Sequence, residues 1–181
     1  MIVYLGECSN KYILNRLKEE GIGRMFSRDW YKLYDGERWG FDNGAYSAWA
    51  KGEPFPYDRF MKRLDFGVSN RPALSIAVCP DIFKGGLESL EFSLDWRPLL
   101  PDEWPWYLAV QDGMSPHDVR GKLDGFSGIF VGGSDGFKST IPEWKKLGMP
   151  IHFGKCGTKN KLRWAAECKV DSLDSSTPIR H

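Results

Sequence analysis

Short apolar runs recur along the whole chain, separated by polar segments with helical periodicity, and this alternation most constrains the fold. Most runs are continuously apolar rather than alternating, as expected for strands that are covered on both faces. Repeated strand–helix alternation predicts a parallel α/β architecture. We expect eight strands, the second of them the weakest, at residues 2–6, 24–27, 39–42, 74–79, 106–111, 128–132, 150–154 and 170–173.

Helical patterns fall between these runs. The first follows a capping residue at Ser9 or Asn10, and the last follows Thr158. Eight strands of this kind predict a closed (β/α)8 barrel of the TIM type. The barrel must be compact, because 181 residues is fewer than this fold usually uses, and its C-terminal end is truncated, because no full helix follows the eighth run. We expect residues 1–181 to form one domain.

Composition excludes several classes of protein. The formal net charge is +1, so the chain as a whole does not predict a polyanion partner. No apolar run approaches the roughly 20 residues that span a bilayer, and the N-terminus lacks a basic leader segment, so we expect a cytoplasmic protein with no membrane partner. The four cysteines form no CxxC pair, which predicts reduced thiols, no bound metal and no cofactor; they are Cys8, Cys79, Cys156 and Cys168.

Two aspartates stand at the ends of predicted strands. Asp42 follows the third run, and Asp174 closes the eighth. The carboxyl ends of parallel barrel strands converge on one face, so these two side chains should meet there. A carboxylate pair with amide and glycine neighbours suits chemistry at a sugar carbon or around a planar heterocycle.

Motifs at five strand ends extend this pattern. They are Asp42-Asn43-Gly44-Ala45-Tyr46, Val110-Gln111-Asp112-Gly113, Val131-Gly132-Gly133, Ile151-His152-Phe153-Gly154 and Val170-Asp171-Ser172-Leu173-Asp174. In this order they resemble motifs of the tRNA-guanine transglycosylase family and of its DNA-acting relatives, which insert 7-deazaguanines into DNA. The resemblance covers nearly the whole chain, and so small a version looks most like the phage-encoded members, which would work in the host cytoplasm.

The resemblance implies an enzyme that exchanges guanine in nucleic acid for a free 7-deazaguanine such as preQ0. Asp174 matches the nucleophile, which forms a covalent ester with the sugar, and a carboxylate suits an oxocarbenium-like transition state. Asp42 matches the general acid/base, and its apolar surroundings predict a raised pKa.

The other matched positions would bind the base. Gln111 and Asp81 would hydrogen-bond its edge, Gly132 and Gly133 would let the backbone approach it, and Asn43 stands where the family has a serine. Two aromatic residues, Tyr46 and Phe153, would sandwich the ring.

A basic segment is the candidate for the nucleic-acid backbone. Its residues are Lys155, Lys159, Lys161 and Arg163, with Arg180 near the C-terminus. The family's cysteine-rich zinc module has no counterpart after Asp174, which favours DNA over tRNA as the partner and leaves a homodimer or a partner subunit open. Among the tryptophans, Trp30, Trp49 and Trp106 are candidates for a nucleic-acid surface.

Other interpretations remain open from the sequence alone. Asp42 also fits an ordinary turn, and Asp174 fits a helix cap. Gly132-Gly133 also suits a phosphate site, while His152 and Asp171 read as structural residues more readily than catalytic ones. The basic segment also fits a solvated helix face. A glycosidase that uses water, or a non-catalytic binding subunit of a larger transglycosylase, would share many of these features.

Overall fold

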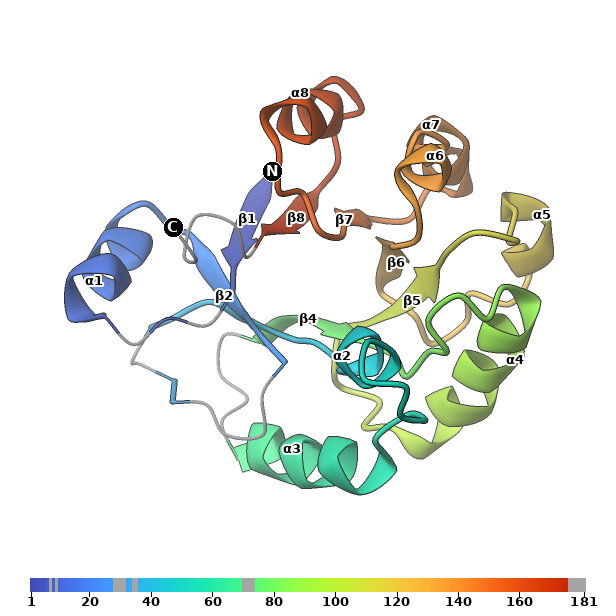
Figure 1. Ribbon diagram of the computed structural model, residues 1–181, viewed down its shortest axis with the longest axis horizontal. Coiled ribbons are helices and arrows are strands. Elements are labelled where there is room, and N and C mark those ends of the chain that lie inside the picture. Colours follow the sequence, from blue (N-terminus) through green and yellow to red (C-terminus); the bar gives the residue numbers. More distant parts are fainter. Residues whose placement is uncertain (7, 9, 28–31, 34–35, 70–73, 176–181) are drawn as a thin grey trace.

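Eight parallel strands close into a barrel in a computed structural model of the chain, in the order β1-β2-β3-β4-β5-β6-β7-β8 (Figure 1). The structure describes residues 1–6, 8, 10–27, 32–33, 36–69 and 74–175. The strands are β1 (Ile2–Leu5), β2 (Gly23–Phe26), β3 (Trp39–Phe41), β4 (Leu74–Val78), β5 (Trp106–Val110), β6 (Gly128–Val131), β7 (Ile151–Phe153) and β8 (Ser172–Ser175). The predicted (β/α)8 barrel is confirmed, including its weak second strand.

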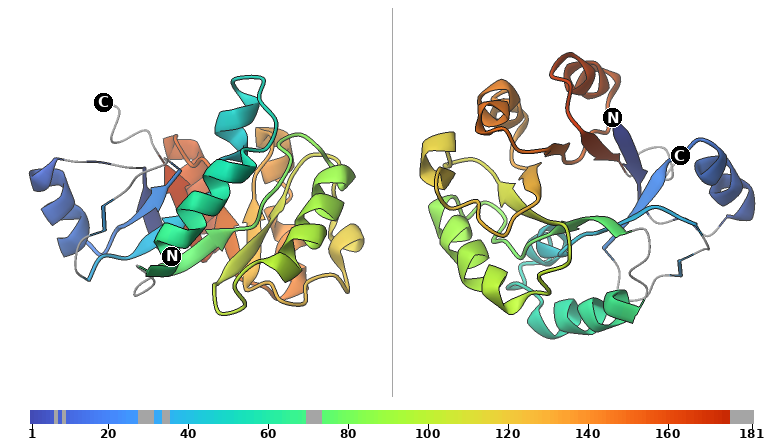
Figure 2. Two further views of the ribbon diagram at one scale, coloured as in Figure 1. Left: turned by 90° about the horizontal axis from the view of Figure 1, so that it is seen from below. Right: turned by 180° about the vertical axis from the view of Figure 1, so that it is seen from behind.

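Helices surround the barrel (Figures 1 and 2). They are α1 (Lys11–Glu19), α2 (Ala45–Trp49), α3 (Tyr57–Ser69), α4 (Leu87–Trp96), α5 (Pro116–Val119), α6 (Asp135–Lys138), α7 (Ile141–Trp144) and α8 (Lys159–Glu167), with single 3₁₀ turns η1 (Arg97–Leu99) and η2 (Lys145–Leu147). Several of these helices are one turn long, which explains how so short a chain completes the fold. In the described part of the β2–β3 connection, at residues 27, 32–33 and 36–38, there is no helix.

Side-chain caps begin the first and last helices where the sequence predicts them. The Asn10 side chain accepts hydrogen bonds from the backbone N–H groups of Tyr12 and Ile13 at 2.9 and 3.3 Å. At α8, the Thr158 hydroxyl accepts the N–H of Lys161 at 3.3 Å. Each cap satisfies donors that the first helical turn leaves unpaired.

Pairing of β1 with β8 closes the ring. Ile2 lies opposite Ser172, and Leu5 lies opposite Ser175. The first and last parts of the chain therefore form one continuous sheet, and the carboxyl end of β8 stands beside that of β1. No helix in the described part of the chain is both long and apolar enough to cross a membrane.

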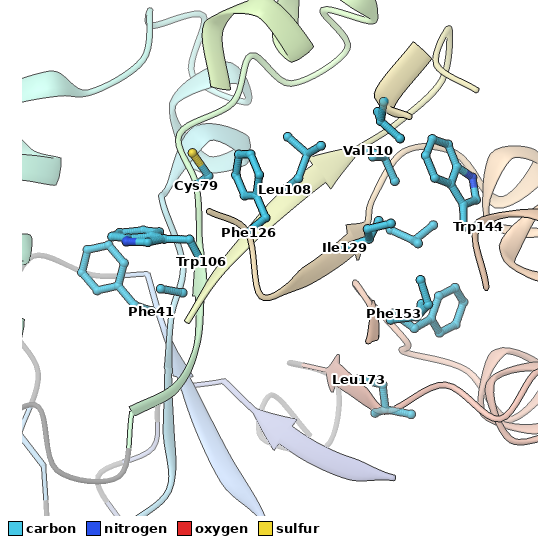
Figure 3. Close-up of a cluster of buried hydrophobic side chains, with 14 of the residues drawn as sticks. Phe41, Cys79, Trp106, Leu108, Val110, Phe126, Ile129, Trp144, Phe153 and Leu173 are labelled. Atoms are coloured by element: carbon cyan, nitrogen blue, oxygen red, sulfur yellow. The ribbon is translucent and has the colours of Figure 1, made fainter. Parts of the chain in front are cut away.

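The main hydrophobic core lies between the barrel and its helices (Figure 3). Because side chains alternate along a strand, every second residue faces this layer. Aromatic rings fill much of the layer near β3 and β5: Phe41 lies 5.3 Å from Trp104 and 6.2 Å from Trp106, in edge-to-face geometry. Trp106 is fully buried, so the prediction that it lies near a nucleic-acid surface is wrong. Trp30 lies outside the described residues.

A second, smaller core fills the barrel itself. Its buried members are Tyr4, Met25, Ile76 and Tyr107. Glycines on neighbouring strands make room for these large side chains: a Cβ at Gly40 would lie 2.7 Å from both Ile76 and Met25, and one at Gly23 would lie 2.7 Å from Tyr4. The interior of the barrel is therefore a packed layer and not a channel.

Gly128 gives the sharpest test of this packing. A Cβ there would overlap the Tyr107 ring and lie 2.8 Å from the Pro150 carbonyl oxygen, which is backbone and cannot rotate away. We expect Gly128→Ala to lower the free energy of unfolding by about 2 kcal/mol, through overpacking of the barrel interior. Urea unfolding followed by circular dichroism measures this change.

Gly136→Ala is the matched control. Its Cβ would meet only the Ser134 hydroxyl, at an ordinary 3.7 Å, and its φ is not positive. The control should be neutral or slightly more stable, since alanine favours the helix. Equal effects of the two substitutions would contradict the account of the barrel interior.

Candidate active site

A cavity of about 240 Å³ opens at the carboxyl ends of the strands. It is smaller than most sites for drug-sized ligands, about 300–1,000 Å³, and suits one small ring system. Most of the residues predicted to act on a substrate line it: Asp42, Asn43, Tyr46, Asp81, Gln111, Gly132, Gly133, Lys155 and Asp174. The closed barrel thus brings together side chains that are up to 132 positions apart in the sequence (42 to 174).

Asp174 is held through one carboxylate oxygen. Its Oδ1 lies 3.1 Å from His152 Nε2 and accepts the backbone N–H of Lys155 at 3.1 Å. Within the described residues, Oδ2 has no hydrogen-bond partner, and the side chain is 19% exposed. Asp174 therefore has one oriented oxygen and one oxygen that is free to react.

His152 is fully buried below this carboxylate and connects it to the barrel interior. Its Nδ1 lies 2.8 Å from the Ser172 hydroxyl, and its ring stacks on Phe130 at 4.8 Å with an interplanar angle of 15°. The imidazole therefore joins the Ser172 hydroxyl to the Asp174 carboxyl group through its two ring nitrogens. His152 is a satisfied structural residue, as the sequence suggested, but it also orients Asp174.

Strand alternation explains which side chains reach the cavity. In β8, Ser172 and Asp174 point inward while Leu173 points to the helices; in β7 only His152 points inward. Phe153 is 1% exposed and packs in the outer core, outside the cavity (Figure 3). The prediction that Phe153 stacks on a bound ring is therefore wrong, because its side chain points to the opposite face of the sheet from that of His152.

Asp42 combines a turn with a place in the cavity. Its Oδ1 accepts the N–H of Gly44 at 2.8 Å, and the Arg63 guanidinium donates to its backbone carbonyl. Gly44 has φ +84°, a conformation that favours glycine, and there it begins α2. The turn interpretation and the functional one thus both apply to Asp42.

Burial raises the pKa of Asp42, and the Asp174 carboxylate adds to the rise. The Gly44 N–H, Arg63 and Lys155 act in the opposite direction. The raised pKa favours the acid form of Asp42, whereas Asp174 is oriented through one oxygen, so the two carboxyl groups are suited to different tasks.

Asn43 organises the neighbouring loop. Its amide nitrogen donates to the Cys79 carbonyl and to Asp81 Oδ1, both at 2.7 Å, and its oxygen accepts the N–H of Ala45 at 2.9 Å. Although Asn43 lines the cavity, its donors are already used within the protein. We therefore revise its predicted role from substrate binding to positioning of Asp81.

Gln111 is engaged in a similar way. Its amide oxygen accepts the N–H of Lys84, and its nitrogen donates to the Ile82 carbonyl at 2.8 Å, with Asp81 Oδ2 a further 3.5 Å contact. These bonds hold the 81–84 loop against β5. The prediction that Gln111 offers a free amide edge does not hold in this arrangement, because the loop occupies that edge.

Asp81 is the carboxylate that these two amides position. Burial raises its pKa to about 7, the Asn43 hydrogen bond lowers it, and the Asp42 charge raises it. It is therefore poised to exchange a proton near neutral pH and to accept hydrogen bonds from a ligand.

The Gly132-Gly133 pair forms the wall after β6. The Gly132 N–H donates to the Val110 carbonyl at 2.9 Å and so continues the sheet. Gly133 has φ +73°, and a Cβ there would lie 2.5 Å from Asp112 Oδ2. Within the described residues the Gly133 N–H has no partner, so it can donate to a ligand.

Two lysines complete the cavity. The Lys155 ammonium lies over the Tyr46 ring at the mouth, where the sequence predicted a phosphate contact. Lys138, at the end of α6, was not predicted; it is 4% exposed and lines the cavity. The only signal for it was its position five residues after Gly133, on the single turn that follows β6.

Aromatic side chains gather at the mouth. The Tyr46 ring lies 5.0 Å from Phe83, and Trp49 lies 4.6 Å from Phe83. Tyr46 and Trp49 are 44% and 43% exposed, which is unusual for such large apolar groups, and the Lys84 ammonium lies 4.6 Å from the Trp49 ring centre. We call Tyr46, Trp49 and Phe83 the mouth cluster.

The rest of the basic segment lies outside the cavity. Lys159 and Arg163 are exposed on α8, and Lys161 forms an ion pair with Asp135 at 2.7 Å. Arg180 lies outside the described residues. Contact of these four residues with a nucleic-acid backbone stays a prediction.

Two further predictions concern structure. Asp171 stands at the amino end of β8, where its carboxylate accepts the N–H of Ile151 at 2.8 Å, so it is structural. Among the residues that the structure describes, no three His, Cys, Asp or Glu side chains form a group that could hold a metal ion.

The raised pKa of Asp81 predicts a pH-dependent stability. Between the ordinary pKa of 3.8 and about 7, the folded protein binds a proton that the unfolded chain has released, so stability falls as pH rises through this window. We expect Asp81→Asn to raise the free energy of unfolding by about 2–4 kcal/mol at about pH 8 and to have little effect at about pH 4. Urea unfolding at both pH values tests this, and a gain that does not depend on pH would contradict the assignment.

In comparisons with models of known protein families and with curated proteins, the chain has no significant match. A proposal for its function therefore starts from the cavity. Two unlike carboxyl groups face one space, a third has a pKa of about 7, and two lysines share the lining.

Proposed function

We propose that this chain is a base-exchange transglycosylase, which replaces guanine in nucleic acid with a free 7-deazaguanine. One observation carries the proposal. Asp42, which directly follows β3, and Asp174, in β8, face a single cavity of ring size, and Asp174 is oriented through one oxygen only. The resemblance of the strand-end motifs supports the choice of chemistry, and DNA is the first substrate to test.

In the first half-reaction, Asp174 Oδ2 attacks the anomeric carbon of the target nucleotide. The bond from this carbon to N9 breaks, its electron pair leaves with guanine, and protonated Asp42 supplies the proton that the leaving base needs. The raised pKa of Asp42 favours the acid form that this step requires. The product is a sugar–Asp174 ester and free guanine.

In the second half-reaction, the Asp42 carboxylate removes the N9 proton from the incoming 7-deazaguanine. N9 then attacks the anomeric carbon and displaces the Asp174 carboxylate, which regenerates the enzyme. Two successive displacements retain the configuration at the sugar. His152 acts as a positioning residue, because its hydrogen bond to Oδ1 leaves Oδ2 to react.

The mouth cluster supplies a surface for nucleic acid. Extruding a base costs a few kcal/mol, which stacking on exposed aromatic rings can offset. Lys84 and Lys155 lie over the rings of Trp49 and Tyr46 and add positive charge where a phosphate backbone would pass. The cluster thus combines the two features that sequence-tolerant binding of single strands requires.

Asp174→Asn should abolish exchange. The assay incubates the protein with an oligonucleotide that carries radiolabelled guanine and an excess of 7-deazaguanine, and measures label release and a covalent adduct on denaturing gels. We expect no adduct and a loss of at least about 1,000-fold in rate for Asp174→Asn, and a loss of about 100-fold or more for Asp42→Asn.

Asp171→Asn is the matched control, because Asp171 lies in the same segment at the opposite end of the barrel. It should release label at the rate of the unchanged protein. Label release that survives Asp174→Asn would reject the nucleophile. Abasic sugar in place of exchanged base would indicate a glycosidase, and tight binding with neither product nor adduct would indicate a non-catalytic binding protein.

Trp49→Ala should weaken binding of a single-stranded oligonucleotide by about 10-fold, because stacking contributes about 1–3 kcal/mol per base. Fluorescence anisotropy with a labelled oligonucleotide measures this, and binding of free guanine should not change. Leu99→Ala is the control: Leu99 is 72% exposed but lies on η1, after α4, away from the mouth. Equal affinities of the Trp49 and Leu99 variants would exclude the mouth cluster as a binding surface.

A further inference from the structure

Lys138 is a charged cavity residue to which the proposed chemistry gives no role. It is 4% exposed, and its side chain passes the Phe153 ring, with the ammonium 5.6 Å from the ring centre. Within the described residues this ammonium has no hydrogen-bond or ion-pair partner, and the nearby Asp135 carboxylate pairs with Lys161 instead. A positive charge that lines a cavity and has no carboxylate bound to it can pair with a ligand of opposite charge.

The electrostatic surroundings agree with this view. Burial lowers the pKa of Lys138, and Lys161 and Lys155 act in the same direction, while Asp135 and Asp174 oppose them. A negative or strongly dipolar ligand atom next to this ammonium would favour its charged form.

The order of groups around the mouth shows which ligand atom can reach Lys138, provided that the proposed function holds. Asp174 lies in β8, Asp81 follows β4, Gly133 follows β6, and Lys138 follows on α6. Around the perimeter of a 7-deazaguanine, N9 is followed by the amine and N1–H donors, then by the acceptor O6, and then by C7.

These two cyclic orders match. With N9 at Asp174, the donor edge lies on the opposite side of the barrel, at Asp81, which can only accept when ionised. O6 then faces the unpaired N–H of Gly133, and C7 faces Lys138. The opposite face of the ring would place the amine against the Gly133 N–H, which pairs donor with donor.

We propose that Lys138 reads the substituent at C7 of the incoming base: it binds an acceptor or anionic group, a nitrile or a carboxylate, and excludes a cationic aminomethyl group. Attraction selects the first class, and like-charge repulsion in a buried site rejects the second. Lys138 is thus a specificity residue and takes no part in the bond-making steps.

The experiment measures binding of four free bases by isothermal titration calorimetry: guanine, and 7-deazaguanines that carry a cyano, a carboxyl or an aminomethyl group at C7. The unchanged protein should bind the cyano or the carboxyl base at least about 10-fold more tightly than the aminomethyl base. Lys138→Met should remove this preference, and Lys138→Glu should reverse it.

Lys161→Met is the matched control. It removes a neighbouring positive charge that is absent from the cavity lining, and it should leave the order of the four affinities unchanged. Competition between the cyano and aminomethyl bases in the exchange assay provides a second readout, in which the ratio of incorporated bases should shift in Lys138→Met but not in Lys161→Met.

The outcomes separate this inference from the proposed function. If guanine binds and exchanges but the variants at Lys138 keep the unchanged order of affinities, the role of Lys138 is wrong and the transglycosylase proposal stands. If none of the four bases binds, both are overturned. If Lys138→Met and Lys161→Met change the preference among the bases by the same amount, the preference arises from long-range electrostatics, and a direct contact with Lys138 is rejected.

Discussion

Closure of the sheet between β1 and β8 is the constraint on which the rest of this molecule depends. In strands of three to five residues, alternation leaves each strand one inward side chain near its carboxyl end. Closing the ring forces these side chains to share one small space, and this is how Asp42 and Asp174 come to face the same cavity. The packed interior below them, where glycines face Tyr4, Met25 and Tyr107, gives the cavity a solid floor.

The sequence predicted the repeated strands and the residues at their carboxyl ends. Apolar runs predicted all eight strands, and the rule that carboxyl ends converge placed Asp42 and Asp174 on one face. The sequence could not show which residues of a strand face the barrel interior. Phe153 and His152 are neighbours, and only the register of β7 decides which of them faces inward.

The sequence also could not predict the hydrogen-bond partners of the polar side chains in the cavity. Asn43 and Gln111 are residue types that suit a base edge, but in the structure both amides are bound to the loop that carries Asp81. Only three-dimensional proximity reveals that competition. Lys138 was missed for the opposite reason. A lysine on a short polar segment predicts a solvated surface, but in the structure Lys138 is buried, with its ammonium over the Phe153 ring.

His152 links the packing of the barrel to the geometry of the reactive carboxylate. Its ring lies flat on Phe130, and the Phe130 ring occupies the space that Gly154 leaves open: a Cβ at Gly154 would lie 2.7 Å from it. A larger side chain at position 154 would push this pair of rings and tilt the imidazole away from Asp174. The orientation of the Asp174 carboxylate thus depends on the absence of a side chain at position 154. We expect substitutions at Gly154 to disturb the site even though Gly154 carries no reactive group.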